Sequence, residues 1–202
     1  MQIAPRAATC HAAPGADAVR AAHDRALRMV EQRAALRDIL WHLASTVEEV
    51  SQGSTLASIL LVDEEGLLRD GASPSLPADY LAAIDRLKPE ANLGTCAAAA
   101  ATGEVVVTPS FYDDSRWAEL RHLPLALGLL GAWSMPIKAA DGRVLGTFGT
   151  YFREHRGPTA QEQEAVALLC SAAALAIAAS GRGAQAARAV GEPQPDGQRA
   201  DD

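Results

Sequence analysis

The sequence predicts an α+β protein, in which helices are segregated around a β-sheet. Two observations lead to this class. Two pairs of short apolar runs are separated by turn residues, which is typical of β-hairpins, and amphipathic helical patterns stand at both ends of the patterned region. In order, the chain predicts a helix, two strands, short helices, a strand, a helix, two strands and a final helix.

The first element is a helix over residues 16–50. Its second half carries a seam of apolar residues at alternating spacings of four and three: Leu36, Leu40, Leu43, Val47 and Val50. Such a seam packs on another part of the protein or on the same helix of a second copy. Residues 1–15, before this helix, are expected to form a disordered arm.

A hairpin follows the first helix. Residues Ala57–Asp63 read as a strand, Glu64–Gly66 as a turn and Leu67–Ala72 as the returning strand. A short amphipathic helix is then expected over Ala78–Leu87. An alanine-rich helix comes after Cys96, with the left-handed stop supplied by Gly103.

The next elements are a strand over Val105–Thr108 and a helix that Asp113 or Asp114 caps. That helix is expected to run to Leu127, with a bend or a shortening at Pro124 because proline lacks the backbone donor.

The second hairpin joins residues 131–138 to residues 144–151 through an Asp-Gly turn at Asp141–Gly142. The last helix, over residues 159–180, opens on the capping box of Thr159 and Glu162. Residues 181–202 mix Gly, Pro, Gln and charge and are expected to be a disordered tail.

Composition excludes several classes of protein. The net charge of −7 argues against a nucleic-acid surface, which needs clustered positive charge. No apolar run is expected to reach the roughly 18 residues of a membrane span. Three scattered cysteines fit a reducing cytoplasm better than a disulfide scaffold. The expected protein is therefore cytoplasmic, with no nucleic-acid or membrane partner.

The side chains are unusually small except in one segment. Alanine supplies 43 of the 202 residues, and seven of the nine aromatic residues lie between Phe111 and Phe152. This clustering predicts one bulky locus within that segment.

Several phrases of the sequence, taken in this order, resemble the GAF domain. They are the Gly94-Thr95-Cys96 turn, TGEVVV, DDSRW, WSMPI, DGRVLGTF and a helix begun by Pro158-Thr159. The resemblance runs from about Leu36 to Ser180, and residues 16–180 are taken as the domain. It is strongest to GAF domains that accompany PAS domains, histidine kinases and cyclic-dinucleotide enzymes.

The resemblance implies an antiparallel sheet with the N- and C-terminal helices on one face and a ligand pocket under short helices on the other. GAF relatives bind cyclic nucleotides, haem, tetrapyrroles or small metabolites there, and their terminal helices commonly pair between subunits. This chain has Leu130 where relatives often have Arg and Ala132 where they often have Cys. The pocket is therefore expected to be more apolar than theirs.

Aromatic and polar side chains near the expected pocket are the candidate ligand-binding residues. Strand alternation puts Trp133 and Met135 on one face, and Trp117 lies on the covering helix, so one ring above and one below would enclose a ligand. The alternative is that these rings fill the core between sheet and helix. The full candidate set is Cys96, Phe111, Tyr112, Arg116, Trp117, His122, Trp133 and Ser134.

Two of these residues carry alternative functions. Cys96 at a helix start could be a reactive thiolate, as in a small GAF-fold enzyme, or a small buried residue at a tight turn. His122 could be an axial haem ligand or a hydrogen-bond donor. Histidines paired at metal-ligand spacing are absent, which disfavours a zinc site.

The sequence thus predicts a stand-alone GAF sensor that binds a small, largely apolar or planar molecule and forms a homodimer through its terminal helices. The stretches outside residues 16–180 are too short for a kinase, cyclase or DNA-binding module. The output is therefore expected to act through dimer rearrangement or a separate signalling protein.

Overall fold

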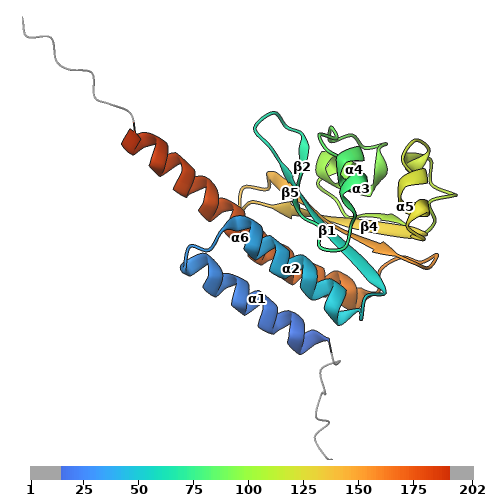
Figure 1. The fold of residues 1–202 in the computed structure, drawn as a ribbon, viewed down its shortest axis with the longest axis horizontal. Coiled ribbons are helices and arrows are strands. Elements are labelled where there is room, and N and C mark those ends of the chain that lie inside the picture. Colours follow the sequence, from blue (N-terminus) through green and yellow to red (C-terminus); the bar gives the residue numbers. More distant parts are fainter. Residues whose placement is uncertain (1–14, 192–202) are drawn as a thin grey trace, which may run out of the picture.

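The computed structural model describes residues 15–191, with side chains as far as Gly181 (Figure 1). The predicted arm over residues 1–15 therefore lies outside the described residues except for Gly15, as does residue 192 onward of the predicted tail. The elements are, in order, α1 (Ala16–Glu31), α2 (Leu36–Val50), β1 (Thr55–Val62), β2 (Leu68–Ala72), α3 (Ala78–Ala83), α4 (Gly94–Thr102), β3 (Val106–Thr108), the 3₁₀ turn η1 (Ser115–Trp117), α5 (His122–Ala126), β4 (Gly131–Lys138), β5 (Val144–Phe152) and α6 (Ala160–Gly191).

The strands form a five-stranded antiparallel sheet in the order β2-β1-β5-β4-β3. Four of its strands come from the two predicted hairpins. In the first, β1 pairs with β2, and in the second β4 pairs with β5 around the turn at Gly142, whose φ is +86°. The central pair joins the two hairpins, with Thr55 opposite Phe152 and Leu61 opposite Gly146. The predicted fold class is confirmed.

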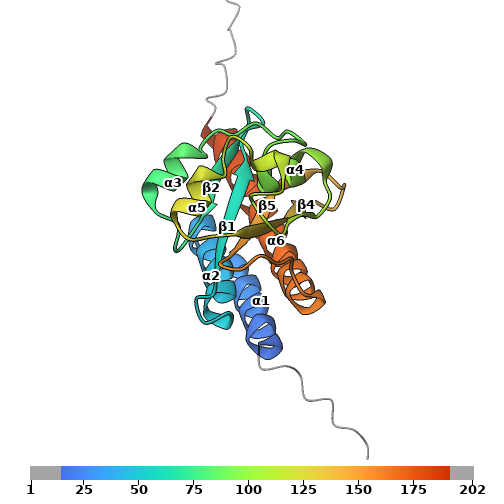
Figure 2. The same cartoon turned by 90° about the vertical axis from the view of Figure 1, so that its right-hand side faces the viewer.

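Helices cover both faces of this sheet (Figures 1 and 2). The terminal helices α1, α2 and α6 bury one face, in a core that includes Leu43, Phe148 and Leu169. The short helices and loops bury the other face, in a second core that includes Tyr80 and Phe111. Both sets of alternating side chains on the central strands are therefore buried.

The helix predicted over residues 16–50 is wrong as a single element, because the chain turns between α1 and α2. Arg33 has a φ of +57°, and the backbone N–H of Ala34 donates to Met29 O at 3.0 Å. This left-handed residue ends α1 in the manner of a glycine stop. The break contains neither Gly nor Pro. Helix α1 folds back against α2 and α6, and its Val19, Ala22 and Ala26 side chains are buried there.

The apolar seam of α2 packs within the chain. Leu40 and Leu43 are fully buried in the terminal-helix core, and Val47 is half-buried beside them. The seam spacing allowed packing within the chain or against a second copy. In the structure it packs within the chain, against the sheet and the other terminal helices.

The predicted helix from Asp113 or Asp114 to Leu127 is also broken. It consists of η1 and α5 with turns between them, and Pro124 lies within the short α5. Asp114 does cap the first turn, since its side chain accepts a hydrogen bond from the backbone N–H of Arg116 at 3.0 Å.

Helix α6 opens on the predicted capping box. The Thr159 backbone N–H donates to Glu162 Oε2 at 2.7 Å, and the Glu162 backbone N–H donates to Thr159 Oγ1 at 3.2 Å. The helix runs past the sheet to Gly191, so it ends later than predicted (Figure 1).

The expectation that no apolar run has membrane-spanning length is wrong for α6. Within the described part of the chain, Ala160–Gly181 is long and apolar enough to cross a bilayer by length and composition alone, and an 18-residue window of it has a mean hydropathy of 1.8. In the structure one side of it packs on the sheet through Val166, Leu169 and Ala173. Burial in the core therefore accounts for part of its apolar character.

Candidate functional site

The candidate site lies between the sheet and the short helices. Its floor is formed by β1, β4 and β5, and its cover by α3, the start of α4 and η1. The cavity between them has a volume of about 20 Å³, which is room for about one water molecule. Its lining residues are Leu60, Tyr80, Ile84, Leu87, Leu93, Gly94, Thr95, Cys96, Ala97, Trp117, Leu120 and Tyr151.

A chain of hydrogen bonds joins α4 to β4 under this cover. Ser134 Oγ donates to Thr95 Oγ1 at 2.9 Å, and Cys96 Sγ lies 3.1 Å from Ser134 Oγ. In the contact between Cys96 and Ser134, either the thiol or the hydroxyl can donate. All three side chains are buried.

Gly149 on β5 allows α4 to approach the sheet this closely. A β-carbon at this position would lie 2.9 Å from Cys96 Sγ and 3.0 Å from Ser58 Oγ. Real β-carbons keep greater distances, so any side chain at position 149 would push α4 away.

Two tyrosines complete the floor and the cover, and sequence reasoning missed both. The rings of Tyr80 and Tyr151 meet edge to face, 6.1 Å apart, and burial raises the pKa of each phenol. Tyr151 belongs to the aromatic cluster between Phe111 and Phe152, and that clustering is the signal that could have placed it. Nothing local to Tyr80 indicates its tertiary contact.

The thiolate expected for Cys96 at a helix start is not favoured by its surroundings. Burial raises the pKa of the Cys96 thiol, and this effect outweighs the hydrogen bonds from Ser134 and the other hydroxyls. The dipole of a nine-residue helix does not compensate for removal from water. Of the two interpretations of Cys96, its surroundings therefore favour the small buried side chain over the reactive thiolate.

We expect Cys96 and Cys170 to react slowly in the folded protein. Both are buried, and burial raises the pKa of both thiols. With iodoacetamide at pH 8, each should be alkylated at least about tenfold more slowly than in urea-unfolded protein. Peptide mass spectrometry over time measures both rates. Alkylation of native Cys96 at the unfolded rate would restore the reactive-thiolate interpretation.

Phe111 and Trp117 lie on the same side of the sheet as Cys96 and Ser134. Their ring centroids are 4.4 Å apart, and both side chains are buried in the short-helix core. The indole N–H of Trp117 donates to Thr108 Oγ1 at 3.2 Å, which fixes the ring against β3.

Arg116 is held by Asp114 and does not line the cavity. Its guanidinium donates to both carboxylate oxygens, with Nη2 2.6 Å from Asp114 Oδ2, and also donates to Val107 O. Burial alone would raise the pKa of Asp114, but hydrogen bonds from Arg116 and Thr108 outweigh it and lower that pKa. Arg116 and Asp114 thus form a clamp that anchors η1 to β3.

Three of the candidate residues lie elsewhere. Trp133 faces the terminal helices, so the expected pairing of its ring with Trp117 across a pocket is wrong. Successive strand residues point to opposite faces, and Ser134 takes the cavity side. Tyr112 and His122 are exposed on the irregular segment around η1 and α5, and neither lines the cavity.

In residues 15–191, His, Cys, Asp and Glu side chains do not gather in any group of three suited to a metal ion.

The chain has relatives in sequence and in structure. Residues 33–178 match the sequence pattern of the GAF domain. Over 154 residues, which is 76% of the chain, it is 34% identical to the methyl sulfide methyltransferase-associated sensor of Methanosarcina acetivorans. The matched region spans 15% of that sensor's length.

Solved structures share the fold. The GAF domain of an Acinetobacter phosphoenolpyruvate-protein phosphotransferase superposes with a TM-score of 0.65 at 16% identity, covering 87% of this chain and 99% of that one. The free methionine-R-sulfoxide reductase of Neisseria meningitidis, solved with its substrate, gives 0.65 at 17% identity, covering 86% and 96%. At these identities the likeness concerns the fold alone.

The sheet, its two helical layers and the covered cavity define a domain of the GAF architecture. With residues 33–178 matching the family pattern, the chain belongs to the GAF domain family.

Proposed function

We propose that this protein is a sensory GAF domain that binds a small molecule under α3 and α4 and transmits its presence to the terminal helices. The observation that carries the proposal is the position of two neighbouring residues on β4. Ser134 closes the hydrogen-bond chain of the cavity, while Trp133 is buried among the terminal helices. A ligand that displaces β4 on one face would therefore also move Trp133 and the terminal helices that pack on the other face.

Binding under α3 and α4 requires the cover to open. A cavity of about 20 Å³ holds about one water molecule, whereas typical ligand sites measure about 300–1,000 Å³. The proposed ligand selects a minor state in which the cover is displaced, and it shifts the population toward that state. Its largely apolar character follows from the walls, where Leu60, Ile84 and Trp117 predominate over the hydroxyls.

The proposed output is a change in how the terminal helices meet a second copy or a partner protein. Within the described side chains, α2 exposes Trp41 and α6 exposes Leu175, at 43% and 53% of their surfaces. Large apolar side chains on the outer surface of these helices support an interface there. The name of the sensor relative supports the sensory role.

The structure favours neither catalysis by Cys96 nor haem ligation by His122. The Cys96 thiol is buried and its pKa is raised, and the His122 side chain is exposed outside the cavity. No observation of the described residues favours either role over sensing.

Native mass spectrometry of freshly purified protein tests the proposal. We expect a dimer at micromolar concentration with a small molecule that collisional activation releases. Ser134→Ala should lose the small molecule, because it removes the hydroxyl between Cys96 and Thr95. The matched control is Ser171→Ala on the exposed side of α6, which should retain it.

Two results would overturn the proposal. One is wild-type protein that carries no small molecule and whose melting temperature no compound of a cellular metabolite library raises. The other is a bound molecule that Ser134→Ala retains as fully as Ser171→Ala does.

A further inference from the structure

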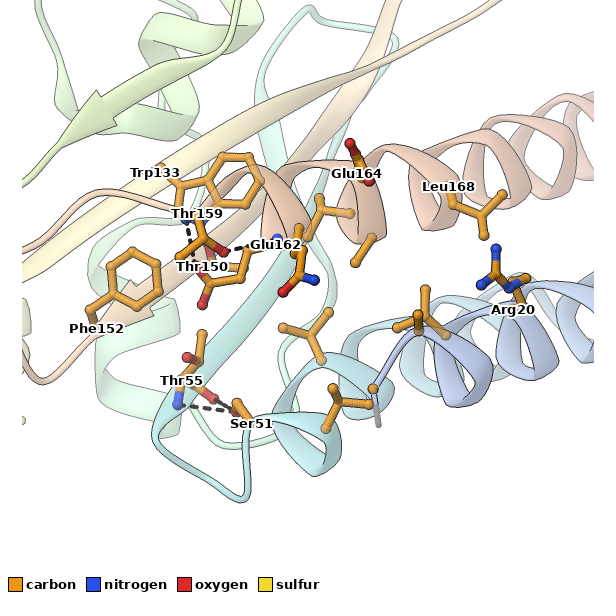
Figure 3. A pocket seen from close by; sticks show the side chains of 18 of the residues that line it. Arg20, Ser51, Thr55, Trp133, Thr150, Phe152, Thr159, Glu162, Glu164 and Leu168 are labelled. Carbon is orange, nitrogen blue, oxygen red and sulfur yellow. Dashed lines mark hydrogen bonds between the residues drawn. The ribbon is translucent and has the colours of Figure 1, made fainter. Parts of the chain in front are cut away.

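A much larger cavity lies on the opposite face of the sheet, between the terminal helices and the ends of β1, β4 and β5 (Figure 3). Its volume is about 680 Å³, which falls in the range of sites that bind drug-sized molecules. It is lined by Gly15, Ala16, Val19, Arg20, Val47, Val50, Ser51, Thr55, Trp133, Thr150, Phe152, Arg156, Thr159, Gln161, Glu162, Glu164, Ala165, Val166 and Leu168.

Three of the lining residues carry buried polar atoms that lack a hydrogen-bond partner among the described residues. These atoms are Trp133 Nε1, Thr150 Oγ1 and Thr55 Oγ1, and each side chain is at least 97% buried. Trp133 and Thr150 are direct partners on β4 and β5, and Thr55 lies on the adjoining strand β1. Buried polar groups without partners are costly and rare.

Two of the four charged residues that line this cavity, Arg156 and Glu162, neutralise one another; the other two are Arg20 and Glu164. Arg156 donates to both carboxylate oxygens of Glu162, at 2.8 Å each, and its guanidinium stacks 3.7 Å from the Phe152 ring centroid. Burial alone would raise the pKa of Glu162, but hydrogen bonds from Arg156 and Thr159 lower it, so the pair stays ionised near neutral pH. A charged ligand group that meets Arg156 or Glu162 would therefore have to displace an existing ion pair.

Apolar side chains form much of the remaining walls, together with Arg20, Ser51, Gln161 and Glu164. Val19 comes from α1, Val47 from α2, Val166 and Leu168 from α6, and Phe152 from β5. These side chains surround the polar end of the cavity with aliphatic and aromatic surface.

We propose that this cavity is a second ligand site, which takes a neutral, largely apolar small molecule bearing a carbonyl or a similar hydrogen-bond acceptor. Less than 1 Å² of each of the unpartnered atoms Trp133 Nε1, Thr55 Oγ1 and Thr150 Oγ1 is exposed, so the side chains that cover them must move aside as the molecule enters. The Trp133 N–H then donates to the acceptor of that molecule, and the Thr55 and Thr150 hydroxyls, as donors or acceptors, hold the same polar end. The aliphatic walls bury the rest of the molecule. The site does not depend on the proposed function, because it uses the other face of the sheet.

Occupation of this site would act directly on the terminal helices. The cavity is bounded by α1, α2 and α6 together, so a molecule in it contacts all three helices and the sheet at once. It would favour one packing of these helices over others. The site is thus placed to modulate whatever interface the helices form.

The neutral ketone dye Prodan is a suitable probe, since its fluorescence shifts to the blue when it leaves water. We expect saturable, blue-shifted binding to the full chain. Thr150→Val, which removes a hydroxyl with little change of shape, should weaken it by about fivefold or more. Trp133→Phe, which removes the indole N–H together with part of a buried ring, should weaken it at least as much. Ala165→Phe should also weaken it, because the added ring occupies part of the cavity.

Thr147→Val is the matched control. It removes an equally buried hydroxyl from the same strand, but Thr147 faces Cys96 on the other side of the sheet and does not line the cavity. We expect wild-type affinity for Prodan. Circular dichroism melting of every variant checks that the fold is retained.

Three outcomes would overturn the proposal. The first is the absence of saturable Prodan binding to the wild type. The second is wild-type affinity in folded Thr150→Val and Trp133→Phe, or a loss confined to Thr147→Val. The third is dye release as the protein concentration rises at a fixed ratio of dye to protein, which would assign the cavity to a second copy of the chain. Since none of these readouts uses the cavity under α4, they leave the proposed function to its own test.

Discussion

Replacing Gly146 with alanine should lower the free energy of unfolding by about 3 kcal/mol or more. Gly146 lies on β5 opposite Leu61 of β1, in the central strand pair. A β-carbon there would lie only 2.2 Å from the backbone oxygen of Leu60 and 3.2 Å from Leu61 Cα. Backbone atoms cannot rotate away as a side chain can, so the pairing of β1 with β5 must distort.

Urea denaturation followed by far-ultraviolet circular dichroism measures this loss. Gly181→Ala is the control, since it lies in α6 with no atom within 4 Å of the added carbon. There we expect unchanged or slightly higher stability, because alanine favours helix over glycine. A Gly146→Ala protein within about 0.5 kcal/mol of the wild type would contradict the close approach of the two strands.

The hairpins and helix boundaries that depend on local chemistry could be predicted from the sequence. The Asp141–Gly142 turn, the Gly103 stop and the Thr159–Glu162 box act through their own backbone neighbours, so a short window contains all the information. The break at Arg33 could not be predicted in this way. Its left-handed residue is stabilised by the packing of α1 on α2 and α6, which no local residue reveals.

The face of each β-strand was harder to predict than the strand itself. In β5 eight of nine residues are buried, so polar and apolar side chains do not separate by alternation. The same holds at the start of β4, where Trp133 and Ser134 are both buried on opposite faces. A sheet covered on both faces loses the contrast that assigns one set of side chains to solvent. From the sequence, the aromatic cluster consequently predicts one site, although the sheet divides it between two cores.

Replacing Leu43 with alanine should lower the free energy of unfolding by about 3 kcal/mol, within the range for a fully buried leucine. Leu43 belongs to the seam of α2, and its side chain is enclosed by the sheet and the terminal helices of the same chain. The substitution leaves a void that these rigid neighbours cannot close. Thermal and urea denaturation of the variant measure the loss.

The dependence of this loss on protein concentration distinguishes the two partners that the seam spacing allows. If Leu43 packs within one chain, Leu43→Ala costs the same stability in dilute and concentrated solution, because no subunit contact is removed. If it packs between copies, the variant dissociates on dilution and its deficit grows as the concentration falls.

Trp41→Ala, on the exposed side of the same helix, is the matched substitution. It should leave the stability of the monomer within about 0.5 kcal/mol of the wild type while weakening the proposed dimer. The opposite pattern, with Leu43 controlling the dimer and Trp41 controlling the fold, would move the subunit interface to the inner side of α2 and would contradict the packing of the terminal helices described above.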